Sequence, residues 1–234
     1  MGESGCGKST LGRTLIRLIK ATSGEITFGG TDITSLSEND FGPYRRRMQL
    51  IFQDPYASLD PRMTVRDIVA EPLKTHKLCH TREEMTERVL SLLRDVGIPE
   101  EFLFRYPHQF SGGQRQRIGI ARAIALDPAL IVCDEPVSAL DVSVQNQILN
   151  LLRQLQHERG LSYLFISHDL SVVRFISDRI CVMFLGRLCE IGYTAEVYSA
   201  PLHPYTRFLI NAIPKADPAA RFEEKLLLTG ELPS

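Results

Sequence analysis

Residues 2 to 10 read Gly-Glu-Ser-Gly-Cys-Gly-Lys-Ser-Thr, and this stretch decides the fold. Gly2, Gly7, Lys8 and Ser9 satisfy the pattern of a phosphate-binding loop. Glycines let the backbone curl so that its N–H groups point at phosphate oxygens, the lysine adds a charge for the β- and γ-phosphates, and the serine hydroxyl can ligate Mg²⁺. The motif therefore predicts a nucleotide site formed by Gly2, Glu3, Ser4, Gly5, Cys6, Gly7, Lys8, Ser9 and Thr10.

The residues after the loop predict a helix. Apolar Leu11, Leu15, Leu18 and Ile19 recur at helical spacing within residues 8–20, and a helix N-terminus favours bound anions. The alternative is a plain glycine-rich turn at a helix start. A loop of this kind normally follows a buried strand, whereas only Met1 precedes it here.

Composition limits the classes of function. The chain has 234 residues and a net charge of −1, so nothing in its charge favours nucleic acid or anionic lipid as a partner. Arg45-Arg46-Arg47 is the densest basic run, and a solvated face is the favoured interpretation over a binding patch. No apolar run approaches the roughly 20 residues that span a bilayer. The five cysteines form no Cys-x-x-Cys pair, which indicates a reducing compartment.

Strands and helices alternate along the chain. Residues 25–28, 48–52, 130–133 and 161–166 read as strands, with a Gly29-Gly30 turn after the first. A helix is expected after Thr81, with Met85, Val89, Leu92, Leu93 and Val96 on one face and a stop at Gly97, and a second over residues 142–159, stopped by Gly160. This alternation predicts an α/β fold with a parallel sheet, and a helical block inserted between two strand regions.

Two carboxylates end the strand Leu130-Ile131-Val132-Cys133. A nucleotide's Mg²⁺ needs a carboxylate at the carboxyl end of a neighbouring strand, and Asp134 fits that place. Glu135 can then act as general base toward the water that attacks the γ-phosphate. The alternative, a strand that ends in charged turn residues, is weakened by the phosphate loop.

A third motif, Ser111-Gly112-Gly113-Gln114, lies upstream of that strand. As local structure it is a capping box, with Ser111 as N-cap and Gln114 three residues later, and such a helix start also makes an anion site. The motif resembles the signature of ATP-binding-cassette (ABC) ATPases. In that family the signature of one subunit covers the γ-phosphate held by the phosphate loop of another.

The remaining motifs of that family occur in order. Gln53 resembles the Q-loop glutamine near Mg²⁺ and the attacking water, and residues 138–141, Ser-Ala-Leu-Asp, resemble the D-loop at the dimer interface. His168, which alone would read as a satisfied polar residue, resembles the switch histidine that contacts the γ-phosphate. The resemblance covers residues 2 to about 214 and implies a P-loop NTPase sheet of the ABC ATPase type.

Finer features resemble one subfamily, the dipeptide/oligopeptide importer ATPases of the second subunit type. These are the segments 53–62, 138–145 and Pro201-Leu-His-Pro-Tyr-Thr206. Relatives that import nickel or glutathione share these stretches and remain an alternative. Some members carry an iron–sulfur site in a cysteine-bearing tail; we expect none here, because no cysteine follows Cys189.

The resemblance implies an ATP-hydrolysing subunit that powers a peptide importer, with ATP and Mg²⁺ as cofactors. In the implied roles Lys8 and the loop amides hold phosphate, Ser9, Gln53 and Asp134 surround Mg²⁺, Glu135 activates water, and His168 stabilises the γ-phosphate. Ser111 to Gln114 and Asp141 act across a head-to-tail dimer with an identical or related subunit. Permease subunits are the other partners, bound at the cytoplasmic face of the membrane, with the helical block as docking surface.

The expected domains are an ABC ATPase domain over residues 1–192, with a helical subdomain at about 54–127, and a C-terminal extension over 193–234. Two rivals are a soluble ABC ATPase of DNA repair or translation and an impaired fragment of a longer subunit. In the family, strands and an adenine-stacking aromatic residue precede the phosphate loop. From residues 1–234 alone we therefore expect weak ATP binding, slow hydrolysis and aggregation through an exposed sheet edge.

Overall fold

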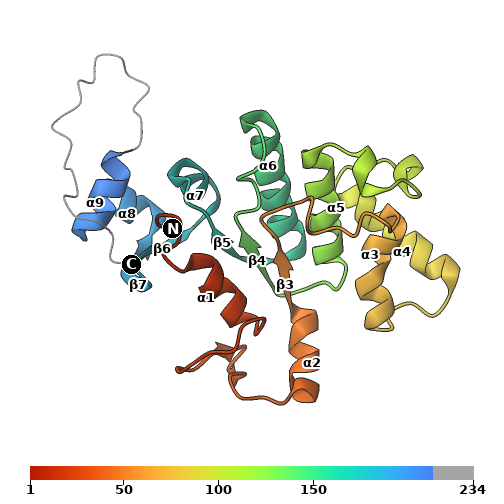
Figure 1. Cartoon of the computed structure of the whole chain (residues 1–234), viewed down its shortest axis with the longest axis horizontal. Coiled ribbons are helices and arrows are strands. Elements are labelled where there is room, and N and C mark those ends of the chain that lie inside the picture. Colours follow the sequence, from red (N-terminus) through yellow and green to blue (C-terminus); the bar gives the residue numbers. More distant parts are fainter. Residues whose placement is uncertain (213–234) are drawn as a thin grey trace. The chain divides into compact units, whose positions relative to one another are not determined.

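The computed structural model describes residues 1–212 (Figure 1). In chain order its elements are α1 (Lys8–Leu15), β1 (Thr27–Phe28), β2 (Thr31–Asp32), α2 (Glu38–Arg47), β3 (Met48–Ile51), α3 (Val65–Thr75), α4 (Arg82–Asp95), η1 (Glu100–Phe102), η2 (Pro107–Gln109), α5 (Gly112–Ile124), β4 (Leu130–Asp134), α6 (Val142–Arg159), β5 (Ser162–Ile166), α7 (Leu170–Ile176), β6 (Arg179–Phe184), β7 (Arg187–Tyr193), α8 (Thr194–Ser199) and α9 (Pro204–Asn211). They form two compact units: a larger unit of residues 7–168, and a smaller unit of residues 1–6 and the described residues from 169 onward.

A parallel sheet of order β3-β4-β5 is the centre of the larger unit. One face, made of residues 48, 50, 130, 132, 164 and 166, packs with Ile16, Ile33 and Phe41. The other face carries Tyr163, whose hydroxyl donates to the Leu152 carbonyl of α6 at 3.0 Å. Because successive side chains of a strand alternate between faces, the helices cover the sheet on both sides. The predicted parallel α/β sheet is confirmed.

Helix α1 packs against the sheet at Gly12. A Cβ atom at Gly12 would lie 2.7 Å from Ile166 Cδ1 and 3.1 Å from Val132 Cγ1, so only glycine allows this approach. Leu11 is exposed, and the helix ends at Leu15, before the predicted end at residue 20. Close backbone packing at Gly12 decides which side of α1 is buried.

Helix α1 ends before the apolar pattern of residues 8–20 does, because Arg17 leaves the helical conformation, with a φ of 56°. Its guanidinium donates to the carbonyls of Ile33, at 3.3 Å, and Leu36, at 2.8 Å, and lies 4.5 Å from the centre of the Phe41 ring. These contacts hold the segment after β2 against the end of α1. Tertiary contacts therefore end the helix where the local apolar pattern continues.

A hairpin and a polar helix precede β3. The hairpin β1–β2 turns at Gly29 and Gly30, both with positive φ, as the sequence predicts. Helix α2 was not predicted, because it is polar and contains Pro43; its N-cap Ser37 accepts a hydrogen bond from the Asp40 N–H at 3.2 Å. The run Arg45–Arg47 forms its exposed last turn, where positive charge meets the negative end of the helix dipole.

Helices α3, α4 and α5 lie between β3 and β4 in the sequence. Each begins at a capping side chain: Thr64, Thr81 and Ser111 accept a hydrogen bond from the N–H three residues later. The predicted apolar face of α4 is buried, with Val89, Leu92 and Leu93 at 0 % exposure. The thiol of Cys133, in β4, is also fully buried, which raises its pKa.

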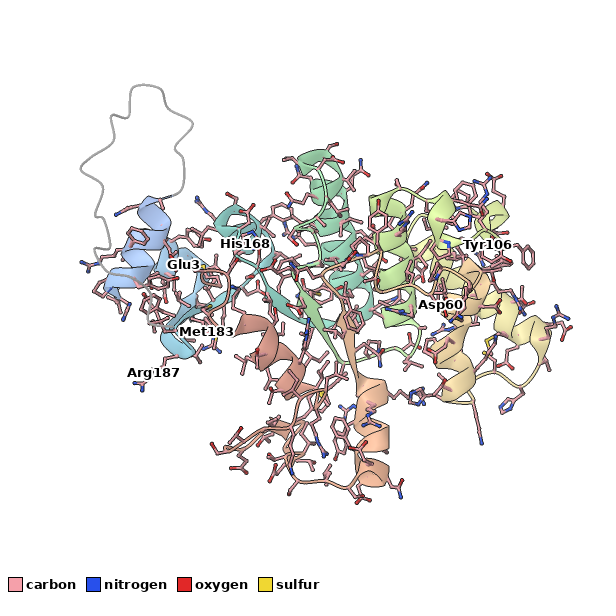
Figure 2. All side chains as sticks on the ribbon, in the orientation of Figure 1. Glu3, Asp60, Tyr106, His168, Met183 and Arg187 are labelled. Carbon is pink, nitrogen blue, oxygen red and sulfur yellow. The ribbon has the colours of Figure 1, made fainter. Side chains whose placement is uncertain are left out.

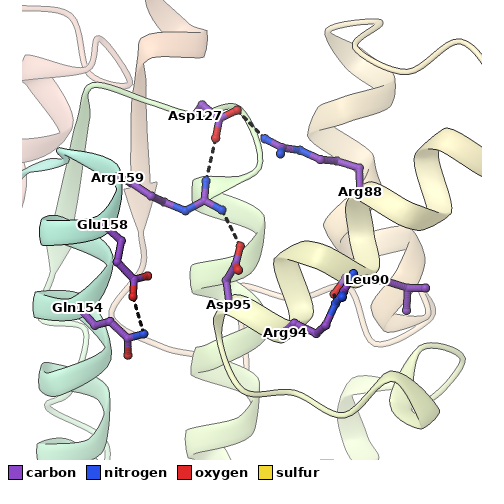
Figure 3. A network of polar contacts seen from close by, with 8 residues as sticks. All are labelled: Arg88, Leu90, Arg94, Asp95, Asp127, Gln154, Glu158 and Arg159. Atoms are coloured by element: carbon purple, nitrogen blue, oxygen red, sulfur yellow. Dashed lines mark hydrogen bonds and ion pairs between the residues drawn. The ribbon is translucent and has the colours of Figure 1, made fainter.

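A network of ion pairs joins α4 to α6 through the turn before β4 (Figure 3). The guanidinium of Arg159, at the end of α6, donates to Asp95 at 2.5 Å and to Asp127 at 2.8 Å. Asp127 also accepts from Arg88 at 2.5 Å. Asp127 has a φ of 48°, a left-handed conformation that aspartate tolerates better than most residues. One turn residue therefore connects two arginines from different helices.

The antiparallel hairpin β6–β7 is the centre of the smaller unit. Its core contains Met1, Val173, Ile180, Val182, Val197 and Tyr205. Met1 pairs with β6: its amino group donates to the Cys181 carbonyl at 2.6 Å, and its carbonyl accepts from the Met183 N–H at 2.8 Å (Met183 is labelled in Figure 2). Helices α7, α8 and α9 complete the described part of this unit.

Candidate functional site

The second half of the phosphate loop opens α1 in the larger unit. Gly7 is the N-cap, in a left-handed conformation with φ 98°, and its carbonyl accepts the first helical hydrogen bond from Leu11 N–H at 2.9 Å. Lys8 and Ser9 are the first two residues of the helix, and Lys8 is 8 % exposed. The loop therefore presents a lysine and a hydroxyl at the positive end of a helix, as the motif predicts.

Asp134 lies at the carboxyl end of β4 and is 1 % exposed. The Ser9 hydroxyl donates to its Oδ1 at 2.5 Å, and the Arg13 guanidinium donates to its Oδ2 at 3.1 Å. A carboxylate this deeply buried needs such partners. The structure thus brings together Ser9 and Asp134, which the sequence assigns to one cation. Sequence reasoning missed Arg13, although a position four residues after Ser9 places it on the same helix face.

The backbone of Glu135, the next residue, is strained. Its φ is 48°, a left-handed conformation that costs a non-glycine residue on the order of 1 kcal/mol. Its N–H donates to the Ile166 carbonyl of β5 at 3.0 Å, and its carbonyl accepts from the Ser138 N–H at 3.2 Å and from the Ser138 hydroxyl at 3.0 Å. These hydrogen bonds stabilise the left-handed turn at Glu135, which is unfavourable for the backbone alone.

The side chain of Glu135 lies between Gln53 and His168. Gln53 Nε2 donates to Oε2 at 3.0 Å, and His168 Nδ1 lies 3.0 Å from Oε1. The Glu135 side chain is 11 % exposed, whereas that of His168 is 49 % exposed. Three residues that follow β3, β4 and β5 therefore meet at one edge of the sheet, because the carboxyl ends of parallel strands lie together.

This edge has the groups that phosphoryl transfer needs. Glu135 is a carboxylate held by an amide and an imidazole, which suits a general base that orients water. Ser9, Gln53 and Asp134 supply only oxygen ligands for a cation, as Mg²⁺ prefers. Within residues 1–212, no three His, Cys, Asp or Glu side chains could hold a metal by themselves. The residues present fit Mg²⁺ in the mode where substrate phosphates complete its coordination.

The signature segment forms the predicted capping box at the start of α5. The Gln114 N–H donates to the Ser111 hydroxyl at 3.3 Å, and the Ser111 N–H donates to Gln114 Oε1 at 3.1 Å. These bonds stay inside the segment. Among the polar contacts of the described residues, none joins Ser111–Gln114 to the Ser9–Asp134 pair or to Glu135.

Asp141, expected to contact nucleotide, acts here as the N-cap of α6 and accepts from the Val144 N–H at 3.0 Å. Val144 in turn lies against the signature: a Cβ atom at Gly113 would be 2.4 Å from Val144 Cγ1. A Cβ atom at Gly112 would likewise lie 3.2 Å from Leu140 Cδ2. The signature and the segment 138–141 are thus neighbours in one subunit, and a nucleotide contact by either stays a prediction.

The first half of the phosphate loop belongs to the smaller unit. Gly2 has a φ of 151° and lies so close to β6 that a Cβ atom would meet the Met183 carbonyl oxygen at 2.1 Å. Gly5, with φ 82°, and Ser4 are exposed. The chain passes from one unit to the other between Cys6 and Gly7, inside the motif.

Two family profiles match the chain. "ABC transporter" matches residues 1–138, and "Oligopeptide/dipeptide transporter, C-terminal region" matches residues 189–234. The second match begins four residues before the predicted extension, and residues 213–234 lie outside the described part. Within residues 1–212 the structure has no helix long and apolar enough to cross a membrane.

Curated relatives and solved structures agree with these profiles. The oligopeptide transport ATP-binding protein OppF of Bacillus subtilis is 58% identical over 93% of this chain and 72% of its own length. OppF of Escherichia coli is 54% identical over 100% of this chain and 70% of its own length. The dimeric ATP-binding cassette MJ0796 bound to ADP and Pi is 33% identical with a TM-score of 0.74, covering 83% of each chain.

Proposed function

Because the chain belongs to the ABC transporter family, we propose that it binds ATP, hydrolyses it and thereby powers an importer of di- or oligopeptides. The observation that carries the proposal is the position of Glu135. Both of its carboxylate oxygens are in contact, with Gln53 and with His168, and its neighbour Asp134 holds the hydroxyl of Ser9. A phosphate loop, a cation carboxylate and a candidate base thus lie on adjacent elements.

In this proposal the amides of residues 2–10 and Lys8 bind the β- and γ-phosphates, at a helix N-terminus that favours anions. Ser9, Gln53 and Asp134 hold Mg²⁺, which when bound neutralises charge on the transferred phosphoryl group. Glu135 accepts a proton from the attacking water. His168, with Nδ1 directed at Glu135, orients that carboxylate and presents its other ring nitrogen to the γ-phosphate.

A second ATP-binding subunit completes the site. The helix N-terminus of Ser111–Gln114 acts on the nucleotide of the partner, and Asp141 lies at the same interface. Support comes from the capping box, which fixes two glycine N–H groups at the positive end of α5, and from the solved cassette MJ0796, which is a dimer bound to ADP and Pi.

The transport substrate and location follow from the relatives. Proteins that are 54–58% identical are named for oligopeptide transport, and the C-terminal match carries the same description. This favours peptides over the alternatives, nickel and glutathione. Another solved neighbour, cbiO1 from Clostridium perfringens, is part of the ABC transporter complex cbiONQ, which supports partners in a transporter complex and a peripheral position at the membrane. The cytoplasmic face, and residues 54–127 as the surface that docks on permease subunits, are what the family resemblance implies.

Replacing Glu135 by glutamine tests the central assignment. The amide keeps the size of the side chain, so ATP binding should be retained while hydrolysis slows by roughly 10²-fold or more. Glu158→Gln is the matched control, since Glu158 is exposed on α6 and, within residues 1–212, accepts a hydrogen bond from Gln154 alone. Steady-state phosphate release and ATP titration give both quantities. Turnover of Glu135→Gln equal to that of the control would remove Glu135 from the role of base.

A further inference from the structure

A tyrosine near the C-terminus contacts the phosphate loop. The backbone N–H of Glu3 donates to the hydroxyl of Tyr205 at 3.2 Å (Glu3 is labelled in Figure 2). Both residues belong to the smaller unit, although 202 positions separate them in the sequence. Glu3 lies between Gly2 and Gly5, the two most conformationally free residues of this half of the loop. The contact therefore restrains the loop between two glycines, where the backbone has the most conformational freedom.

Tyr205 is itself held firmly. It is 4 % exposed, and its ring lies 4.3 Å from that of Phe184, centre to centre. Burial raises the pKa of its phenol, so the hydroxyl stays protonated at neutral pH. It is the second residue of α9, where the side chain of the N-cap His203 accepts from the Tyr205 N–H at 3.1 Å.

A carboxylate fixes the start of α9. Glu190 of β7 accepts from the Leu202 N–H at 2.9 Å and from the His203 N–H at 3.0 Å. Burial acts to raise the pKa of Glu190, but these hydrogen bonds outweigh it and the pKa is lowered. Glu190 is thus ionised at neutral pH and binds the segment that carries Tyr205.

The same hairpin anchors both ends of the loop segment. Met1 pairs with β6, and the Cys6 carbonyl accepts from the N–H of Gly186, in the β6–β7 turn, at 3.0 Å. Tyr205 contacts the loop segment at Glu3, between the anchored residues Met1 and Cys6. A loop that binds phosphate through its amides works best when those amides are already in place, since ordering them on binding reduces affinity.

We infer that Tyr205 is a positioning residue for the phosphate loop, through which α9 sets the affinity for the triphosphate group. The inference rests on the proposed function of residues 2–10. Tyr205 does not touch the ligand; it acts through the backbone of Glu3. Its loss weakens binding of ATP and of inorganic tripolyphosphate by the same factor, because the adenosine part is not involved.

Tyr205→Phe removes the hydroxyl and keeps the ring against Phe184. Tyr198→Phe is the matched control: Tyr198 is a tyrosine of α8 in the same unit, and its hydroxyl donates to the Leu170 carbonyl, away from the loop. In the full chain we expect the Glu3 amide of Tyr205→Phe to exchange with solvent about tenfold faster, and the dissociation constants of ATP and tripolyphosphate to rise about three- to tenfold. The KM for ATP should rise by the same factor with kcat nearly unchanged.

The outcomes separate this inference from the proposed function. If Tyr198→Phe matches Tyr205→Phe in thermal stability but keeps wild-type exchange at Glu3 and wild-type binding, the positioning role is supported. Wild-type exchange and affinity in Tyr205→Phe would overturn it, with the ATPase assignment intact. If the wild-type chain binds neither ligand, the proposed function fails, while exchange at Glu3 still reports whether Tyr205 holds the loop.

Discussion

A methyl group added at Gly113 has no room against α6. The new Cβ atom would lie 2.4 Å from Cγ1 of Val144, far inside van der Waals contact. Val144 cannot easily turn away, since a β-branched side chain in a helix has one strongly preferred rotamer. Its backbone is also fixed, because its N–H donates to Asp141 at 3.0 Å. Relief therefore requires α5 and α6 to move apart.

The magnitude follows from two opposing effects. Overpacking of this kind costs about 1–3 kcal/mol, and alanine recovers up to about 1 kcal/mol through its better helix propensity. We expect Gly113→Ala to lower the free energy of unfolding by about 1–2 kcal/mol. Val144→Ala alone should cost about 1 kcal/mol through lost packing. The clash is absent in the double variant. Its loss of unfolding free energy should therefore be smaller than the sum of the two single losses by about 1–2 kcal/mol.

Urea unfolding followed by circular dichroism measures all four corners of this cycle. Gly119→Ala is the control within the same helix, because a Cβ atom there meets nothing within 4 Å. That variant should be stabilised by up to about 1 kcal/mol. Additivity of Gly113→Ala and Val144→Ala within about 0.5 kcal/mol would refute the proposed clash between the signature segment and the start of α6.

Two further predictions concern charges. Arg159→Met should lower the free energy of unfolding by about 1 kcal/mol in dilute buffer and by less in concentrated salt, because the ion pairs of Arg159 with Asp95 and Asp127 are partly exposed. Urea unfolding midpoints at both salt levels measure this loss, with Arg46→Met at an exposed position as the control. Equal losses at both salt levels would contradict an ionic origin. The hydroxyl of Thr64, with Lys74 and Arg66, lowers the pKa of Asp67 below 3.8, so its stabilisation is present above that pH and is lost as the pH falls through the lowered value. Asp67→Asn should therefore be less stable than wild type near pH 7, and urea unfolding should show this difference shrinking as the pH falls below 3.8, whereas a constant difference would show that the charge is irrelevant.

The sequence predicts best where one local signal decides the structure. Ser111 with Gln114 is a complete capping box, and α6 follows its apolar pattern to Gly160, which ends it in a left-handed conformation. The meeting of Gln53, Glu135 and His168 was also predictable, because a parallel sheet gathers the residues that follow its strands. Helix α2 was missed because its stability depends on Phe41, a single buried aromatic residue in a polar segment.

Contacts between distant segments account for what sequence reasoning could not find. The buried face of α1 depends on the close approach of Gly12 to β4 and β5, which the apolar residues of α1 do not indicate. In the sequence Tyr205 is only part of the family-like segment 201–206, and the folded smaller unit is what brings its hydroxyl to Glu3. The strain at Glu135 is likewise visible only in backbone angles.

The order of strands in the sheet has a consequence for how the chain folds. Met48 of β3 pairs with Leu130 of β4, and Leu130 pairs in turn with Ser162 of β5, so β3 joins β4 across a much longer stretch of chain than β5 does. The longer closure costs about 0.8 kcal/mol more in chain entropy. During synthesis β3 is made first, yet its partner is made only after α3, α4 and α5. Those helices can form from local contacts while β3 is still unpaired. Of the three strands of this sheet, β3, which carries Gln53 to the site, therefore stays unpaired longest as the chain emerges.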